Sequence, residues 1–254
     1  MRLTTVGTGT VAFTGRRVCA GHFLEAGATR ILLDCGSGVA HRMAEAGLPW
    51  REITHLALTH FHADHVSDLP VLVQAWKYGG IPGRRDALSV IGPRGTQRLW
   101  GQMTEMHEWL REPGFPLTIV EIEPGQTLPL GDGATISAYK VPHTATSVAY
   151  SIVRGRRRVV YTGDTGYDPM FAEWALRADV LLCECSLPSH MSIPDHLTPE
   201  QCGAIAAAAL PQHLVLTHFY PPVEDVDVRR IVGTYYAGPV TLATDGAAFE
   251  IEED

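Results

Sequence analysis

Apolar and polar residues are arranged along this chain in segments that predict strands and helices in turn. Short apolar runs predict strands, as at residues 29–34 and 53–58. Longer segments carry apolar residues at helical spacing, as at residues 66–78. Another helix is predicted after Thr198-Pro199, because a threonine cap followed by proline is typical of a helix start. The alternation of the two kinds of segment indicates an α/β fold.

Further elements follow from the same pattern. Helices are predicted at 38–46, 92–110, 168–176 and 225–236, and strands at 88–91, 117–122, 134–141, 146–153, 159–162, 179–183, 214–217, 240–243 and 248–251. In the helix at 92–110, Trp100, Met103, Met106 and Trp109 recur at helical spacing, and we expect them to pack against the core.

One strand sequence occurs twice. The segment from His55 to His60 reads His-Leu-Ala-Leu-Thr-His, and the segment from His213 to His218 differs from it at one position. Each strand delivers a histidine at its carboxyl end, which predicts two similar halves that share one site. His55 and His213 lie five residues earlier, on the opposite face of an extended strand, so we expect them to be structural.

Composition excludes several classes of protein. The chain of 254 residues has the length and mixed composition of a globular protein, and without a linker-like segment we expect one domain over residues 1–254. No apolar run approaches the roughly 20 residues of a membrane span, and no secretory signal is visible, so we expect a cytoplasmic protein without membrane contact. Five cysteines without a C-x-x-C pair indicate reduced thiols. The net charge of −8 opposes a broad electrostatic grip on nucleic acid.

The strand at 53–58 leads into the densest group of potential metal ligands in the chain. His60, His62, Asp64 and His65 lie within six residues, and histidine and carboxylate are good ligands for zinc and related ions. Three further candidates each follow a predicted strand: His143, Asp164 and His218. Together the seven side chains supply enough donors for two metal ions.

The run His60-Phe61-His62-Ala63-Asp64-His65 resembles the hallmark His-x-His-x-Asp-His motif of the metallo-β-lactamase superfamily. This resemblance implies a four-layer αββα sandwich with a site for two divalent ions, zinc or alternatively manganese, along one edge of its two sheets. It also implies the ligands: His60, His62 and His143 for one ion, Asp64, His65 and His218 for the other, and Asp164 as the bridge.

Within that superfamily the chain is most similar to the ribonuclease Z and phosphodiesterase group, nearly from end to end. The similar segments are Gly7-Thr8-Gly9, Leu33 to Gly38, Thr162-Gly163-Asp164-Thr165 and Ala243-Thr244-Asp245-Gly246. Cys183-Glu184-Cys185-Ser186 occupies the place of that group's His-Glu-Ala-Thr loop, and His196-Leu197-Thr198 that of its His-Ser-Thr box. The resemblance implies that Glu184 and His196 assist proton transfer to the leaving oxygen, although a buried carboxylate and a helix-cap neighbour are the structural alternatives.

The chain differs from ribonuclease Z in the segment that would bind tRNA. True ribonuclease Z carries a long arm that grips tRNA, commonly between the third and fourth motifs. Here only about twenty residues separate His143 from Asp164, and a hairpin fills them. The one basic cluster, at 154–158, is a short turn. We therefore favour a small-molecule or nucleotide phosphodiester over RNA as the substrate. A homodimer is plausible from the resemblance alone.

The expected mechanism uses a hydroxide that bridges the two ions as the nucleophile. Asp64 would orient it, while His196, tuned by Glu184, would protonate the departing alkoxide. Two alternatives use the same core: tRNA 3′-end processing, and hydrolysis of a carboxylic ester, lactone or thioester. A metal-holding or redox module is disfavoured because His62 stands where the redox members usually have glutamate.

Overall fold

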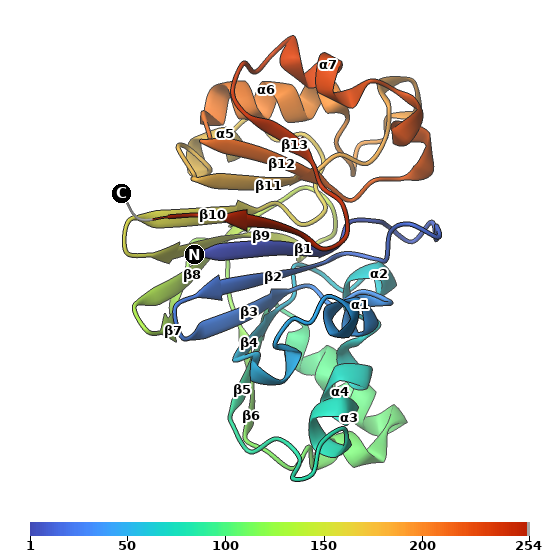
Figure 1. Ribbon diagram of the computed structural model, residues 1–254, viewed down its shortest axis with the longest axis vertical. Helices are drawn as coiled ribbons and strands as arrows, with labels where there is room; N and C mark the ends of the chain where they lie inside the picture. Colours follow the sequence, from blue (N-terminus) through green and yellow to red (C-terminus); the bar gives the residue numbers. More distant parts are fainter. Residues whose placement is uncertain (253–254) are drawn as a thin grey trace.

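Two seven-stranded sheets pack face to face in the computed structural model, which describes residues 1–252 (Figure 1). The first sheet has the order β14-β1-β2-β3-β4-β5-β6. Its strands are β1 (Arg2–Gly7), β2 (Gly21–Ala26), β3 (Thr29–Leu33), β4 (His55–Ala57), β5 (Leu88–Gly92), β6 (Leu117–Glu121) and β14 (Ala247–Glu250). The second sheet has the order β13-β12-β11-β10-β9-β8-β7. Its strands are β7 (Thr127–Gly131), β8 (Ala134–Lys140), β9 (Val148–Arg154), β10 (Arg157–Tyr161), β11 (Val180–Glu184), β12 (His213–Thr217) and β13 (Val240–Leu242).

Helices cover the outer face of each sheet (Figure 1). The first sheet is covered by α1 (Val39–Glu45), α2 (Ala63–Val66), α3 (Leu69–Tyr78) and α4 (Thr96–Met106), and the second by α5 (Phe171–Trp174), α6 (Pro199–Ala209) and α7 (Val228–Gly233). Short 3-10 turns lie at Trp50–Glu52, Glu108–Arg111, Ser189–Met191 and Pro221–Asp225. The longest helices have 11 residues, and none in residues 1–252 could cross a membrane.

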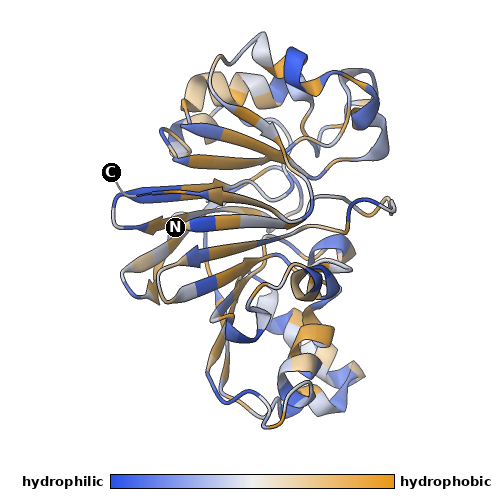
Figure 2. Ribbon diagram, viewed as in Figure 1, coloured by the Kyte–Doolittle hydropathy of each residue, from blue (hydrophilic) through white to orange (hydrophobic). Residues whose placement is uncertain are grey.

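Three separate apolar clusters fill the spaces between these layers. One lies between the two sheets and includes Leu24 and Tyr150. A second lies between the second sheet and α5 to α7, and a third between the first sheet and α1, α3 and α4. Figure 2 shows the apolar residues concentrated along the strands. Three clusters require four layers, so the predicted αββα sandwich is confirmed.

Parallel strands determine where a site can form. In the first sheet β3, β4, β5 and β6 run parallel, and in the second β10, β11, β12 and β13 do. The carboxyl ends of parallel strands meet at one edge of a sheet, and ligand sites of α/β proteins gather there. The two copies of the repeated strand are β4 and β12, one in each sheet, as expected for two halves that share a site.

Several predicted elements were inaccurate. The helix expected at 66–78 begins only at Leu69, as α3, after the short α2 has ended at Val66, and α4 ends at Met106 rather than near residue 110. Met106 is 79% exposed, so its expected role in the core is wrong, whereas Trp100, Met103 and Trp109 pack partly buried against the third cluster. Strands β2 and β7 had no prediction.

The start of α6 gives a test of local stability. The hydroxyl of Thr198 accepts a hydrogen bond from the backbone amide of Gln201, and the Gln201 side chain accepts one from the Thr198 amide. Replacing Thr198→Ala removes half of this capping box and should lower the free energy of unfolding by about 1 kcal/mol. Urea denaturation should show Thr198→Ser close to the wild type, because serine keeps the hydroxyl; equal losses in both variants would contradict the capping role.

Candidate metal centre

The seven candidate ligands come together at the edge where the parallel strands of both sheets end. His60 and His62 follow β4, and Asp64 and His65 lie in the first turn that comes after it, α2. His143 lies between β8 and β9, Asp164 follows β10 and His218 follows β12. Segments that are far apart in the sequence therefore deliver the whole set to one place.

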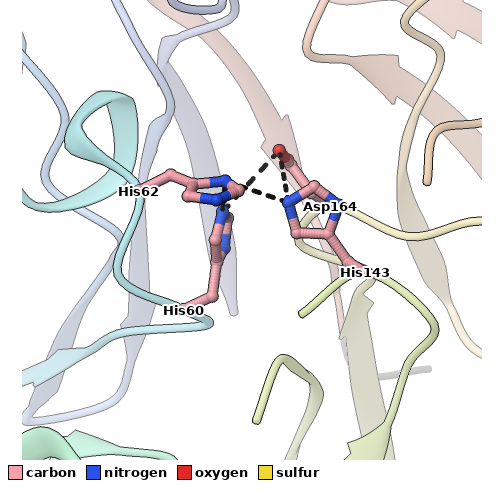
Figure 3. A group of neighbouring side chains, drawn as sticks. All are labelled: His60, His62, His143 and Asp164. Carbon is pink, nitrogen blue, oxygen red and sulfur yellow. Dashed lines mark hydrogen bonds and ion pairs between the residues drawn. The ribbon is translucent and has the colours of Figure 1, made fainter. Parts of the chain in front are cut away.

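One group of donors consists of three histidines and a carboxylate (Figure 3). The Nδ1 atom of His62 lies 3.1 Å from His60 Nε2 and 3.0 Å from His143 Nε2. Asp164 Oδ2 lies 3.8 Å from His60 Nε2 and 3.7 Å from His143 Nε2. Three ring nitrogens and a carboxylate oxygen that face one another at these distances form an arrangement that could hold a divalent ion.

A second group shares Asp164 with the first. His65 Nε2 and His218 Nε2 lie 3.3 Å apart, and Asp164 Oδ1 is 3.2 Å and 3.3 Å from them. Asp64 Oδ2 completes the group at 3.5 Å from His218 Nε2. Because its two oxygens face the two groups separately, Asp164 has the placement that a bridging ligand requires.

Hydrogen-bond partners, two side chains and one backbone carbonyl, fix the outer nitrogen of three of these rings. His65 Nδ1 lies 2.8 Å from Asp34 Oδ2, His143 Nδ1 lies 3.0 Å from the carbonyl of Asp195, and His218 Nδ1 lies 3.0 Å from Ser186 Oγ. An acceptor at Nδ1 orients the ring and leaves Nε2 without its proton, as metal-binding histidines require. The two groups thus already hold the orientation suited to ions.

The electrostatics of Asp164 agree with this arrangement. Its side chain is 3% exposed, and among residues 1–252 the buried Oδ1 atom finds no hydrogen-bond partner. Burial opposes its charge, but the neighbouring His218 and His65 outweigh that cost and hold the pKa of Asp164 well below its usual value. A buried, ionised oxygen without a hydrogen-bond donor costs free energy unless a cation satisfies it, so the residues present fit two divalent ions.

The chain matches the "Beta-lactamase superfamily domain" family over residues 29–219, a span that contains all seven candidate ligands. The chain belongs to this superfamily. The family and the fold that the motif His60 to His65 suggested are therefore confirmed.

Relatives within the superfamily are similar over nearly their whole length. "Probable metallo-hydrolase YhfI" of Bacillus subtilis is 26% identical over 98% of this chain and 100% of its own. "Ribonuclease Z" of Mycobacterium sp. (strain KMS) is 28% identical over 96% of this chain and 94% of its own. The names of these relatives support a hydrolase and do not decide the substrate.

Solved structures agree with the sequence relatives. The crystal structure of the metallo-β-lactamase fold protein YhfI from Bacillus subtilis superimposes with a TM-score of 0.84, at 26% identity, over 98% of each chain. The short form of human tRNase Z superimposes with a TM-score of 0.83, at 22% identity, over the full length of both chains. The second likeness supports the fold alone.

The expected proton-transfer pair lies beside the second group. His196 Nδ1 is 3.0 Å from Glu184 Oε1, and the His196 ring stacks against His218 with centroids 5.6 Å apart. Burial alone would lower the pKa of His196, but the hydrogen bond to Glu184 and its charge outweigh this effect and raise that pKa to about 9. Glu184 is fully buried and also accepts hydrogen bonds from the backbone amides of Thr165 and Leu197.

Three residues at the site had no assigned role in it from sequence. Asp34 and Ser186 hold His65 and His218, as described above. The ring of Tyr220 lies edge-on to both His196 and His218, at 5.8 Å and 6.0 Å between centroids. Its position two residues after His218 is the one sequence signal that could have placed it there. The repeated strand histidines His55 and His213 instead contact Thr54 and Thr241, away from the centre.

Removing the shared carboxylate tests the proposed ligand set. Asp164→Ala removes the carboxylate that four histidine nitrogens share, so we expect purified protein to retain less than half of the wild-type metal content in elemental analysis. Asp168→Ala is the matched control, because Asp168 accepts a hydrogen bond from Tyr139 and contacts no candidate ligand. An Asp164→Ala variant that keeps both ions at full occupancy would exclude the bridging assignment.

Proposed function

We propose that this metallo-hydrolase is a phosphodiesterase that acts on a small or flexible phosphodiester with two divalent ions, zinc being the first choice. The observation that carries the proposal is the contact of Glu184 with His196 directly beside the Asp164 and His218 donors. Cleavage of a phosphodiester requires a cation-rich site for the phosphate oxygens and an acid for the departing alkoxide. The chain offers both within one cluster.

The ions would be held by the ligand set His60, His62, His143, Asp64, His65, His218 and Asp164. Bound there, two divalent ions would lower the pKa of a water molecule and offset the charge on the phosphate. Asp64 lies in the first turn of α2 with its carboxylate facing the site, where it can accept a proton and orient the attacking water.

His196 has the geometry of a general acid. Its Nδ1 is engaged by Glu184, so Nε2 is the atom that can donate a proton to the leaving oxygen. Three donors fix Glu184 in turn: the two backbone amides of Thr165 and Leu197 and the hydroxyl of Ser186. A fixed carboxylate behind the imidazole favours the protonated ring, which is the form an acid must have before the reaction.

Ribonuclease Z activity is the second candidate, because several relatives bear that name. The space between His143 and Asp164 holds only β9, β10 and their connection. In the basic tip at 154–158, Arg154 pairs with Asp132 and Arg157 with Asp179, so two of its charges are already compensated. Both observations favour a substrate smaller than tRNA.

Two substrates with different leaving groups distinguish acid catalysis by His196 from a structural role of this residue. His196→Ala should slow cleavage of thymidylyl-thymidine by about 10²-fold or more, because its alkoxide must be protonated. Cleavage of thymidine 5′-(p-nitrophenyl phosphate) should fall far less, because p-nitrophenolate departs without a proton.

The control for this test is His190→Ala, since His190 is an exposed histidine on the neighbouring 3-10 turn. Metal content of both variants should match the wild type. An equal loss on both substrates would contradict the assignment of His196 as the acid.

A panel of substrates tests the reaction class. With zinc or manganese added, the wild type should cleave phosphodiesters faster than carboxylic esters, lactones or thioesters, and faster than precursor tRNA at equal concentration. Initial rates by chromatography and gel analysis measure the order. Activity on esters alone would defeat the proposal, and preferred cleavage of precursor tRNA would favour the second candidate.

A further inference from the structure

A large groove lies beside the loop that follows the candidate ligand His143. Its volume is about 770 Å³, and its walls come from the start of α4, the end of β6, the end of β8 and the loop after His143. His196, in contrast, precedes α6, and its ring lies 5.0 Å from that of His143 and 5.6 Å from that of His218. The groove is lined by residues of the segments 93–98, 121–124 and 140–146, so its walls are separate from the segment that carries the proposed acid.

The wall of the groove is built directly onto the metal-binding motif. Phe61, between His60 and His62, lies against Gly95, where an added Cβ would come within 3.1 Å of the ring. Gly95 also has a φ of 106°, which side-chain-bearing residues rarely adopt. Glycine at this position lets the loop before α4 approach the motif closely, so one wall of the groove touches the segment that carries His60 and His62.

Three cationic side chains line the groove. Arg94 and Arg98 are exposed, and within residues 1–252 neither guanidinium has a hydrogen bond or an ion pair. Lys140 donates to carbonyl oxygens, those of Val141 at 2.6 Å, Thr144 at 2.7 Å and Ser147 at 3.4 Å. Within residues 1–252 no carboxylate forms an ion pair with any of the three cations, although the chain as a whole carries −8.

Two carboxylates also line the groove, and they differ in what they do. Glu121 Oε1 accepts hydrogen bonds from the backbone amides of Gly95 at 2.9 Å and Gln97 at 3.0 Å, so it caps α4. Glu123 is exposed and would oppose an anion. Because Glu121 already occupies the amides at the start of α4, recognition of an anion here falls to Arg94, Arg98 and Lys140.

We infer that this groove binds a second phosphate, carried by the part of the substrate that stays attached to the cleaved phosphate. The inference rests on the proposed function: the leaving group departs toward His196, whereas the retained group is an equatorial substituent of the phosphorus under attack and extends in a different direction, here toward the groove. Two arginines can bind phosphate oxygens through several donors each. The preferred substrate class is then a phosphodiester with a further phosphate on its retained nucleoside, as in a nucleotide chain.

Two chromogenic substrates that differ by one phosphate test this inference. Thymidine 5′-(p-nitrophenyl phosphate) and its 3′-phosphorylated form have the same leaving group, so a difference in kcat/KM reports on the retained part. The zinc-loaded wild type should favour the phosphorylated form about fivefold, the effect expected of exposed ion pairs. In the double variant Arg94→Ala/Arg98→Ala the ratio should fall to about one, through KM.

Matched variants control for net charge. The double variant Arg85→Ala/Arg156→Ala removes the same two charges from exposed positions at the opposite ends of the strands and should keep the wild-type ratio. Glu123→Gln should raise the ratio, because it removes the opposing carboxylate. A wild type without preference, or a preference that survives in Arg94→Ala/Arg98→Ala, overturns the inference.

Binding measured without turnover separates this inference from the proposed function. Calorimetry on the zinc-loaded protein should show thymidine 3′,5′-bisphosphate binding about fivefold more tightly than thymidine 5′-monophosphate, with the difference lost in Arg94→Ala/Arg98→Ala. Tighter binding of the bisphosphate supports the assignment of the groove even if neither diester is cleaved. Absence of cleavage would count only against the proposed phosphodiesterase activity. Equal binding of the two nucleotides overturns the groove assignment while leaving the proposed reaction untouched.

Discussion

The buried carboxylate of Asp34 joins the two sheets directly beneath the metal centre. It accepts hydrogen bonds from the backbone amide and hydroxyl of Thr59, from the Tyr161 hydroxyl and from His65 Nδ1, at 2.7 to 2.9 Å. A carboxylate with no solvent exposure is strongly destabilising unless donors surround it, so these partners must all stay in place. Tyr161 belongs to the second sheet, whereas Thr59 follows β4 of the first sheet and His65 lies in α2. The packing of the two sheets and the geometry of the site therefore depend on the same carboxylate.

Other rings of the centre are likewise held by a hydrogen bond to the ring nitrogen that faces away from the metal donors. Ser186 holds His218 and also donates to Glu184, which links one proposed ligand to the carboxylate behind the proposed acid. The orientation of the metal donors and that of His196 are thus coupled through Ser186. Ordered partners of this kind hold ligands in position before an ion binds, so little reorganisation is needed when it does.

Sequence could predict those features of this site that depend on neighbours in the chain or on strand ends. The motif from His60 to His65 is local, its distant candidate partners each follow a predicted strand, and the resemblance implied how they group and which fold they share. The hydrogen bonds of Asp34 join residues up to 127 positions apart, so periodicity gives no indication of them. Strand β2 is buried on both faces and lacks the alternation of a half-exposed strand, and β7 contains Pro129 at the sheet edge.

The densest basic segment of the sequence lies away from the site, and the topology of the sheets explains why. The densest basic run, at 154–158, forms the tip between β9 and β10, at the opposite end of β10 from Asp164. Arg94, Arg98 and Lys140 are dispersed in sequence, but each lies near the carboxyl end of a strand, β5 or β8, whose end adjoins the centre. Because the strands bring their ends to one edge, residues near those ends decide what the site binds, whereas a basic run at the opposite end cannot reach the substrate. Which substrate the site prefers therefore depends on the residues near the carboxyl ends of the strands, and not on where basic residues are densest in the sequence.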